Sequence, residues 1–164
     1  MREKVLIPTR GVIALDIINS LNSMGMETVL MHSPEDSLSL PVKLADRSFK
    51  FYSSRLEDSY LDGEAILEKA GEIKADYIHP GYGFLAESPE FARRCRENGV
   101  RFIGPEGTVL AAVEDKIQLR RVAAALGLPV LKYSPLIRSP LDCETCDDDF
   151  TYPLILKPLK GSGG

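Results

Sequence analysis

A lysine followed by a glycine-rich run is the first feature of this sequence with the residue types for chemistry. Lys157 ends an apolar run, and residues 158–164 read Pro-Leu-Lys-Gly-Ser-Gly-Gly. Backbone N–H groups of such a loop can surround phosphate oxygens, and a lysine can neutralise them as a point charge. The pattern predicts a strand over residues 154–157 and a phosphate-binding loop after it, so that the chain holds part of a nucleotide site. The alternative is an unstructured glycine and serine tail.

A second dense segment, residues 79–87, reads His-Pro-Gly-Tyr-Gly-Phe-Leu-Ala-Glu and follows a predicted strand. Ligands bind α/β sheets at the carboxyl ends of their strands. Gly81 and Gly83 permit positive φ and a close approach of the backbone. Glu87 precedes the next helix, where a carboxylate is stabilised. The segment is interpreted either as a binding loop or as a structural turn with its aromatic side chains in the core.

Histidines and cysteines give little support for catalysis or metal binding. His79 has the chemistry of a base, although a hydrogen-bonded structural histidine is the favoured interpretation. Cys143 and Cys146 have C-x-x-C spacing, but a zinc site needs a second pair or nearby histidines. We therefore expect no metal ligands in this chain. The third cysteine, Cys95, falls in a predicted helix, and an odd count of three indicates a reducing compartment.

The composition is that of an ordinary globular chain. Of 164 residues, 44% are hydrophobic and 27% are charged, which suits one domain, or one domain plus part of another. The net charge of -4 argues against a nucleic-acid surface. No run approaches the ~18 apolar residues of a membrane helix, and the amino terminus does not have the pattern of a signal peptide. We expect a cytoplasmic protein without nucleic-acid or membrane partners.

Strand and helix patterns alternate along the first two-thirds of the chain. Strands are predicted at residues 5–7, 28–31, 48–52, 76–79 and 101–103, with helices between most of them. This alternation predicts a doubly wound α/β fold with a parallel sheet over residues 1–105. The first strand is followed by one glycine, Gly11, instead of a G-x-G-x-x-G motif, which disfavours a dinucleotide-dependent oxidoreductase. Residues 106–126 then have a helical pattern.

Several of these segments together resemble the biotin carboxylase family. The matching motifs are Lys4-Val5-Leu6-Ile7 with Arg10-Gly11, Val42-Lys43-Leu44-Ala45-Asp46, Ser59-Tyr60-Leu61, His79-Pro80-Gly81-Tyr82-Gly83-Phe84-Leu85 with Glu87, Phe102-Ile103-Gly104-Pro105, Asp115-Lys116 and Tyr152-Pro153-Leu154-Ile155-Leu156-Lys157. They follow in order along the whole chain. The resemblance implies a Rossmann-like (pre-ATP-grasp) domain over residues 1–112. It also implies that residues 113–164 are a helical linker and the incomplete start of an ATP-grasp domain, whose lid covers ATP.

The resemblance also implies a function. Members of this ligase family make carboxyphosphate from bicarbonate and MgATP, and then carboxylate biotin on its carrier protein. The residues implied to bind ATP are Lys116, Lys157, Gly161, Gly163 and Gly164. The residues implied to line the edge of the active site are His79, Gly81, Tyr82, Gly83 and Glu87. The Mg²⁺ ligands and catalytic residues belong to a further C-terminal part, so we expect this chain to be inactive alone. The implied partners are the biotin carboxyl carrier and carboxyltransferase components.

Several positions depart from the family pattern. Thr9 and Val12 stand where asparagine and glutamate are usual, and Asp16 stands where many bacterial members have arginine near the dimer contact. In the lid loop, Pro158-Leu159-Lys160 stand where small residues are usual, and Ser162 replaces a glycine. These departures bear on activity and dimerisation, and the oligomeric state stays open. Two alternatives therefore stay beside the carboxylase: a non-catalytic binding or regulatory domain with this fold, and a different ATP-grasp ligase. The acyl acceptor of the full carboxylase is not specified by these motifs.

Overall fold

The computed structural model describes residues 2–142 and 150–158. It divides into two compact units, Met1–Leu110 and Ala111–Gly164, each of which is described by itself. Among the described residues, the five strands and both hydrophobic clusters lie in the first unit, which therefore has its own core.

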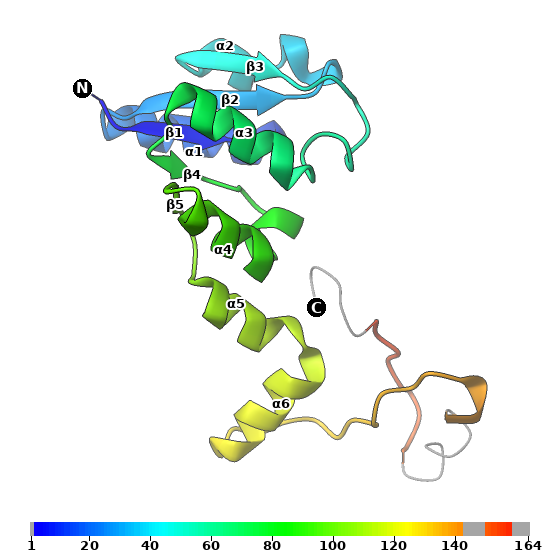
Figure 1. The fold of residues 1–164 in the computed structure, drawn as a ribbon. Coiled ribbons are helices and arrows are strands. Elements are labelled where there is room, and N and C mark those ends of the chain that lie inside the picture. The colour runs from blue at the N-terminus through cyan, green and yellow to red at the C-terminus, as the bar shows by residue number, and fades with distance from the viewer. Residues whose placement is uncertain (1, 143–149, 159–164) are drawn as a thin grey trace. The chain divides into compact units, whose positions relative to one another are not determined.

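The first unit is built on a five-stranded parallel sheet with the order β3-β2-β1-β4-β5 (Figure 1). The strands are β1 (Lys4–Ile7), β2 (Glu27–His32), β3 (Arg47–Lys50), β4 (Tyr77–Ile78) and β5 (Arg101–Phe102). The chain runs outward from β1 to β3 and then crosses to the other side of β1 to form β4. The strand order therefore reverses between β1 and β4. The predicted doubly wound parallel sheet is confirmed.

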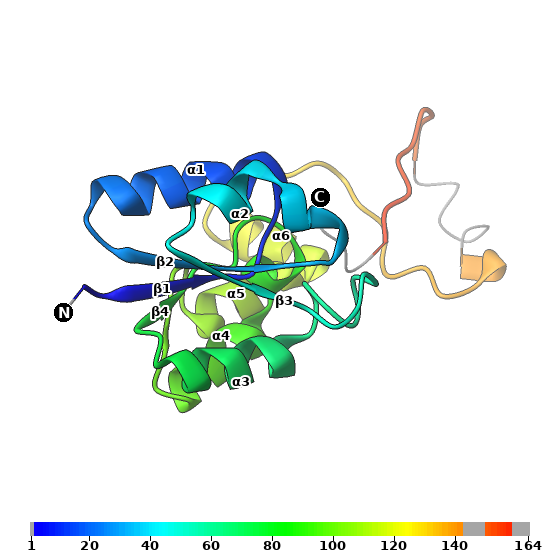
Figure 2. The same cartoon turned by 90° about the horizontal axis from the view of Figure 1, so that it is seen from above.

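Helices cover both faces of this sheet. Helices α1 (Gly11–Ser23) and α2 (Leu40–Leu44) lie on one face, and α3 (Gly63–Ile73) and α4 (Pro89–Glu97) lie on the other (Figure 2). Alternate residues of β1 supply the two cores: Leu6 packs with the α3 and α4 side, while Val5 and Ile7 pack with the α1 side. This alternation is the period of two that a strand buried on both faces requires.

Local side chains fix where the helices of the second layer begin. The Asp62 side chain accepts a hydrogen bond from the Ala65 N–H at 3.0 Å and caps α3. The Ser88 hydroxyl oxygen accepts from the Phe91 N–H at 3.1 Å and caps α4. Both contacts satisfy donors that a helix leaves unpaired in its first turn. Pro89 follows the cap as the first residue of α4, a position that proline favours.

Three short elements of the first unit were not predicted. These are the 3₁₀ helices η1 (Glu35–Leu38) and η2 (Phe84–Glu87) and the helix α2, which are too short to show a helical period in the sequence. Strand β3 also ends at Lys50, two residues before the prediction. Phe49 and Phe51 nevertheless pack against the same cluster, as the predicted alternation requires.

The second unit carries helix α6 (Lys116–Ala125), and α5 (Gly107–Glu114) spans the boundary between the units. The predicted helical stretch is interrupted at Asp115, whose side chain caps α6 by accepting from the Ile117 and Gln118 N–H groups. None of the helices in the described ranges is long and apolar enough to cross a membrane.

The predicted strand at residues 154–157 is wrong. The structure gives these residues no regular secondary structure and leaves Ile155 and Leu156 more than three-quarters exposed. A strand needs a neighbour to take up its backbone hydrogen bonds. Within residues 111–142 and 150–158 the structure contains no strand that pairs with them. The strand was predicted from the apolar run alone, without evidence for a neighbouring strand.

Candidate functional site

The candidate site lies where β1 and β4 end side by side. Leu6 of β1 pairs with Ile78 of β4, so the loops that follow the two strands leave the same edge of the sheet. The loop after β1 leads to α1 on one face, and the loop after β4 leads through the 3₁₀ helix η2 (Phe84–Glu87) to α4 on the other face. In doubly wound sheets, ligands bind in the crevice at the carboxyl edge where loops diverge in this way.

Gly81 brings the two loops into direct contact. Its φ is +79°, and a Cβ added to it would lie 2.6 Å from both Cβ and Oγ1 of Thr9. Real Cβ atoms do not approach other heavy atoms so closely, and L side chains rarely adopt this φ. Only glycine therefore fits at this position, and Thr9 of the loop after β1 sets the position of the loop after β4.

His79 is held at the base of the same loop. Its N–H donates to the Leu6 carbonyl at 2.9 Å, and its Nδ1 accepts from the Gly81 N–H at 3.2 Å. Burial lowers the pKa of His79, because a low-dielectric environment disfavours the charged ring. These contacts agree with the favoured interpretation of a hydrogen-bonded structural histidine.

At the tip of the loop Tyr82 faces solvent, whereas Leu85 of η2 packs against the core. Tyr82 is 73% exposed, and Gly83 has φ +116° and ψ -154°, a region that is essentially reserved for glycine. Glu87 is exposed at the end of η2. The structure thus brings His79 and these residues together in one loop at the edge of the crevice. Contact between this loop and a ligand stays a prediction.

A second cluster at the same edge was missed by sequence reasoning. The Arg10 guanidinium lies 5.4 Å from the centre of the Tyr60 ring. The Tyr60 hydroxyl donates to Asp36 Oδ2 at 2.8 Å and accepts from the Ser33 N–H at 2.9 Å. Burial is the main cause that raises the pKa of Tyr60 to about 12. The four residues are spread over fifty positions. Arg10 and Tyr60 appeared only as members of two separate family motifs, and Ser33 and Asp36 appeared in none.

The residues expected to bind ATP fall in the second unit or outside the described residues. Lys116 is the first residue of α6. Lys157 is exposed in the irregular segment. Gly161, Gly163 and Gly164 lie outside the described residues. Their role in binding ATP stays a prediction.

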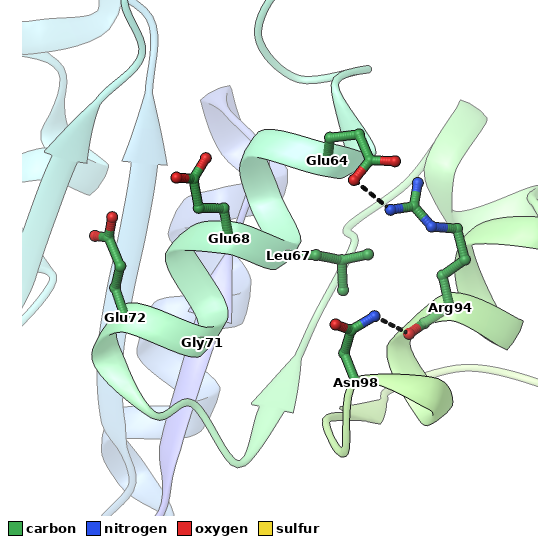
Figure 3. A pocket seen from close by; sticks show the side chains of 7 residues that line it. All are labelled: Glu64, Leu67, Glu68, Gly71, Glu72, Arg94 and Asn98. Atoms are coloured by element: carbon green, nitrogen blue, oxygen red, sulfur yellow. Dashed lines mark hydrogen bonds and ion pairs between the residues drawn. The ribbon is translucent and has the colours of Figure 1, made fainter.

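A groove between α3 and α4 is separate from this edge (Figure 3). It has a volume of about 480 Å³ and is lined by Glu64, Leu67, Glu68, Gly71, Glu72, Arg94 and Asn98. Arg94 forms an ion pair with Glu64 at 2.5 Å across it. No strand-end loop contributes to the groove, so it is not part of the candidate site.

Metal-binding and thiol chemistry gain no support from residues 2–142 and 150–158. Within these ranges, no group of three or more His, Cys, Asp or Glu side chains is placed to hold a metal ion. Cys143 and Cys146 lie outside the described residues. Cys95 is fully buried, and burial raises the pKa of its thiol to about 11. It is therefore an inert core residue.

A parallel sheet covered on both faces, with a crevice at its reversal point, defines an α/β domain of the Rossmann-like class. The family model for "Biotin carboxylase, N-terminal domain" matches residues 1–110. The chain belongs to the biotin carboxylase family, and its first unit is the N-terminal domain of that family.

Curated relatives and solved structures agree with this assignment. Biotin carboxylase 2 of Bacillus subtilis is 38% identical over the whole chain, which covers 37% of that protein. The 2-oxoglutarate carboxylase small subunit of Hydrogenobacter thermophilus is 36% identical over the whole chain, which covers 35% of it. A crystal structure of the biotin carboxylase domain dimer of the Hydrogenobacter thermophilus 2-oxoglutarate carboxylase contains MgADP, ADP and bicarbonate. It matches this chain with a TM-score of 0.90 and 35% identity, and the match covers 99% of this chain and 36% of that one. The chain thus spans about a third of the length of these relatives.

Proposed function

We propose that this chain is the amino-terminal portion of the biotin carboxylase component of a biotin-dependent carboxylase. The full enzyme is an ATP-grasp ligase that uses bicarbonate and MgATP to carboxylate biotin on its carrier protein, and it works with a carboxyltransferase component. The observation that carries the proposal is the place of the His79–Glu87 loop. The segment that most resembles the family lies at the edge where this class of sheet binds ligands, and its Gly81 packs closely against Thr9 of the neighbouring loop.

Each part of the chain has a distinct task in this proposal. The first unit supplies the crevice, with Tyr82 and Glu87 exposed along it. Lys116 and Lys157 supply positive charge for the nucleotide phosphates, and Gly161, Gly163 and Gly164 supply the lid loop. Mg²⁺ neutralises the phosphates during phosphoryl transfer. The described residues offer no carboxylate cluster that fits this metal, so none of them is assigned to hold it.

This division of tasks leaves the chain without catalysis of its own. Phosphoryl transfer depends on metal ions and charge clamps held in fixed positions, and two lysines supply only a fraction of them. Bicarbonate-dependent phosphate release by the isolated chain should therefore not exceed that of Lys157→Ala. Release clearly above that variant would show that the chain contains a complete site.

The proposed function is tested by transplanting the first unit. Residues 1–110 replace the matching segment of Biotin carboxylase 2 of Bacillus subtilis, and ADP formation is measured with and without bicarbonate and free biotin. The unit contains both hydrophobic clusters, so we expect the chimera to fold. ADP formation should require bicarbonate and rise with biotin, as in the parent.

Two controls make the outcome decisive. Circular dichroism and size-exclusion chromatography establish that the chimera is folded and monodisperse. The parent protein, prepared in the same way, establishes the activity of the assay. A folded chimera without biotin-stimulated ADP formation would favour the alternative of a non-catalytic domain with the same fold.

A further inference from the structure

The contact between His79 and Gly81 has a definite direction. A backbone N–H can only donate, so the His79 Nδ1 at 3.2 Å must present a lone pair to it. The ring is then neutral and carries its hydrogen on Nε2. The other histidine of the chain shows the opposite arrangement: the His32 Nδ1 lies 2.8 Å from the Ser33 carbonyl oxygen, which can only accept. The two histidines therefore require opposite tautomers.

We propose that His79 is a positioning residue for the proposed active-site loop: its neutral imidazole holds the Gly81 turn in place, and protonation of the ring releases that turn together with Tyr82. A protonated ring carries a hydrogen on both nitrogens. Nδ1–H would then face the Gly81 N–H, so that two donors oppose each other where a hydrogen bond had been.

Besides the packing of Gly81 against Thr9, the turn at Gly81 is held by the hydrogen bond from the Gly81 N–H to His79. Gly81 has φ +79° and lies against Thr9, and Gly83 has φ +116°. Glycine adopts positive φ at no steric cost, so these residues permit the turn but leave its hold to neighbouring contacts. Pro80 is buried and fixes the approach to the turn, while Tyr82 is largely exposed and is not anchored by the core. The N–H of Gly81 is the polar anchor between the buried and the exposed part of the loop.

The surroundings of His79 keep the ring neutral near pH 7. The charged side chains on adjoining segments are Lys4 of β1, Arg10 of the loop after β1, Arg101 of β5 and Glu87 of η2. None of them is a cause of its shift: burial lowers the pKa of His79, and a hydrogen bond with its own backbone opposes burial more weakly. The turn should therefore be held at neutral pH and released on acidification, at a pH below the ordinary titration of histidine.

Nuclear magnetic resonance on the 164-residue chain tests the proposal without any ligand. Only His32 and His79 contribute to imidazole ¹H–¹⁵N spectra, and His32→Gln assigns them. At pH 7 we expect an Nε2–H tautomer for His79 and an Nδ1–H tautomer for His32. On acidification the Gly81 amide resonance should shift with the same midpoint as the His79 ring.

Two variants separate positioning from a general structural role. In His79→Asn the side-chain oxygen takes the place of Nδ1 and can still accept from Gly81, but it does not titrate. In His79→Gln the oxygen extends to the position of Nε2 and loses that contact. In His79→Asn, we expect the Gly81 amide to stay protected against hydrogen exchange, and its chemical shift to become independent of pH. In His79→Gln, we expect the Gly81 amide to lose this protection at every pH.

Other results would overturn the proposal. An Nδ1–H tautomer for wild-type His79 at pH 7 would do so, as would a Gly81 amide that does not follow the titration of the ring. Equal Gly81 protection in His79→Asn and His79→Gln would do the same. None of these readouts depends on biotin or ATP, so the proposed function is tested separately by the chimera.

Discussion

At the residue scale, Gly81 carries the tightest constraint of the candidate site. The sequence suggested that a glycine here permits close approach of the backbone, and the structure identifies Thr9 as the neighbour. The identity of that neighbour was not predictable, because the two residues are joined by strand pairing between β1 and β4 instead of by proximity in the sequence.

Gly81→Ala should destabilise the first unit. The added Cβ meets Thr9 at 2.6 Å and is attached to a backbone with φ +79°, so we expect a loss of about 1–3 kcal/mol in the free energy of unfolding. Gly71→Ala is the matched control: Gly71 is inside α3 and has no heavy atom within 4 Å of the added carbon. It should gain about 0.5–1 kcal/mol. Urea unfolding measures both, and equal effects would contradict the proposed contact.

Tyr60→Phe should lower stability by an amount that depends on pH. The change leaves the buried Ser33 N–H and Asp36 without the hydroxyl, which costs about 1–3 kcal/mol near pH 8. The pKa of Tyr60 is raised to about 12, so between pH 10 and 12 the unfolded wild type loses its phenolic proton while the folded one keeps it. Wild-type stability therefore falls by about 2–3 kcal/mol over this range.

The Tyr60→Phe variant has no phenol at this position to ionise on unfolding, so it does not lose stability in this way. The difference in stability between wild type and variant should therefore close as the pH rises from 10 to 12. Thermal unfolding at several pH values measures the gap. Tyr52→Phe is the control, because Tyr52 is fully exposed and the loss of its hydroxyl should leave the stability unchanged. A gap that stays constant up to pH 12 would show that the phenol is not held neutral by burial.

At the element scale, the apolar periodicity of the sequence predicted the main strands and helices of the first unit. The strands and helices of the first unit alternate in apolar pattern, and the starts of α3 and α4 carry capping residues. The strand predicted at residues 154–157 failed because a strand depends on a partner that its own sequence does not specify. The Arg10–Tyr60–Asp36 cluster was missed for a related reason: three separate loops meet only after the sheet has formed.

The cap of α3 offers an element-scale test. In Asp62→Ala the Ala65 N–H loses its acceptor at 3.0 Å, and we expect the free energy of unfolding to fall by about 1 kcal/mol. Asp58→Ala is the control, since Asp58 is exposed and forms a surface ion pair with Arg55 at 3.6 Å. Its loss should cost less than about 0.5 kcal/mol. Chemical denaturation compares the two, and equal losses would remove the capping role.

At the scale of the whole molecule, strand order turns these local features into a site. The reversal between β1 and β4 brings the loops at Thr9 and Gly81 to one edge and sends the following helices to opposite faces. The sequence predicted a parallel doubly wound sheet and a loop at a strand end. It did not specify the order 3-2-1-4-5, because the long strands β1 and β2 are apolar on both faces and are compatible with several positions in a sheet.

The central claim is that the exposed side chain of Tyr82 belongs to the working edge of a biotin carboxylase. The most direct measurement is biotin-dependent ADP formation by the chimera with Tyr82→Ala, compared with Tyr52→Ala. Both tyrosines are largely exposed, but only Tyr82 lies beside the crevice between β1 and β4. We predict that kcat/KM falls about tenfold or more for Tyr82→Ala and is unchanged for Tyr52→Ala. Equal activity of the two folded variants would contradict the account.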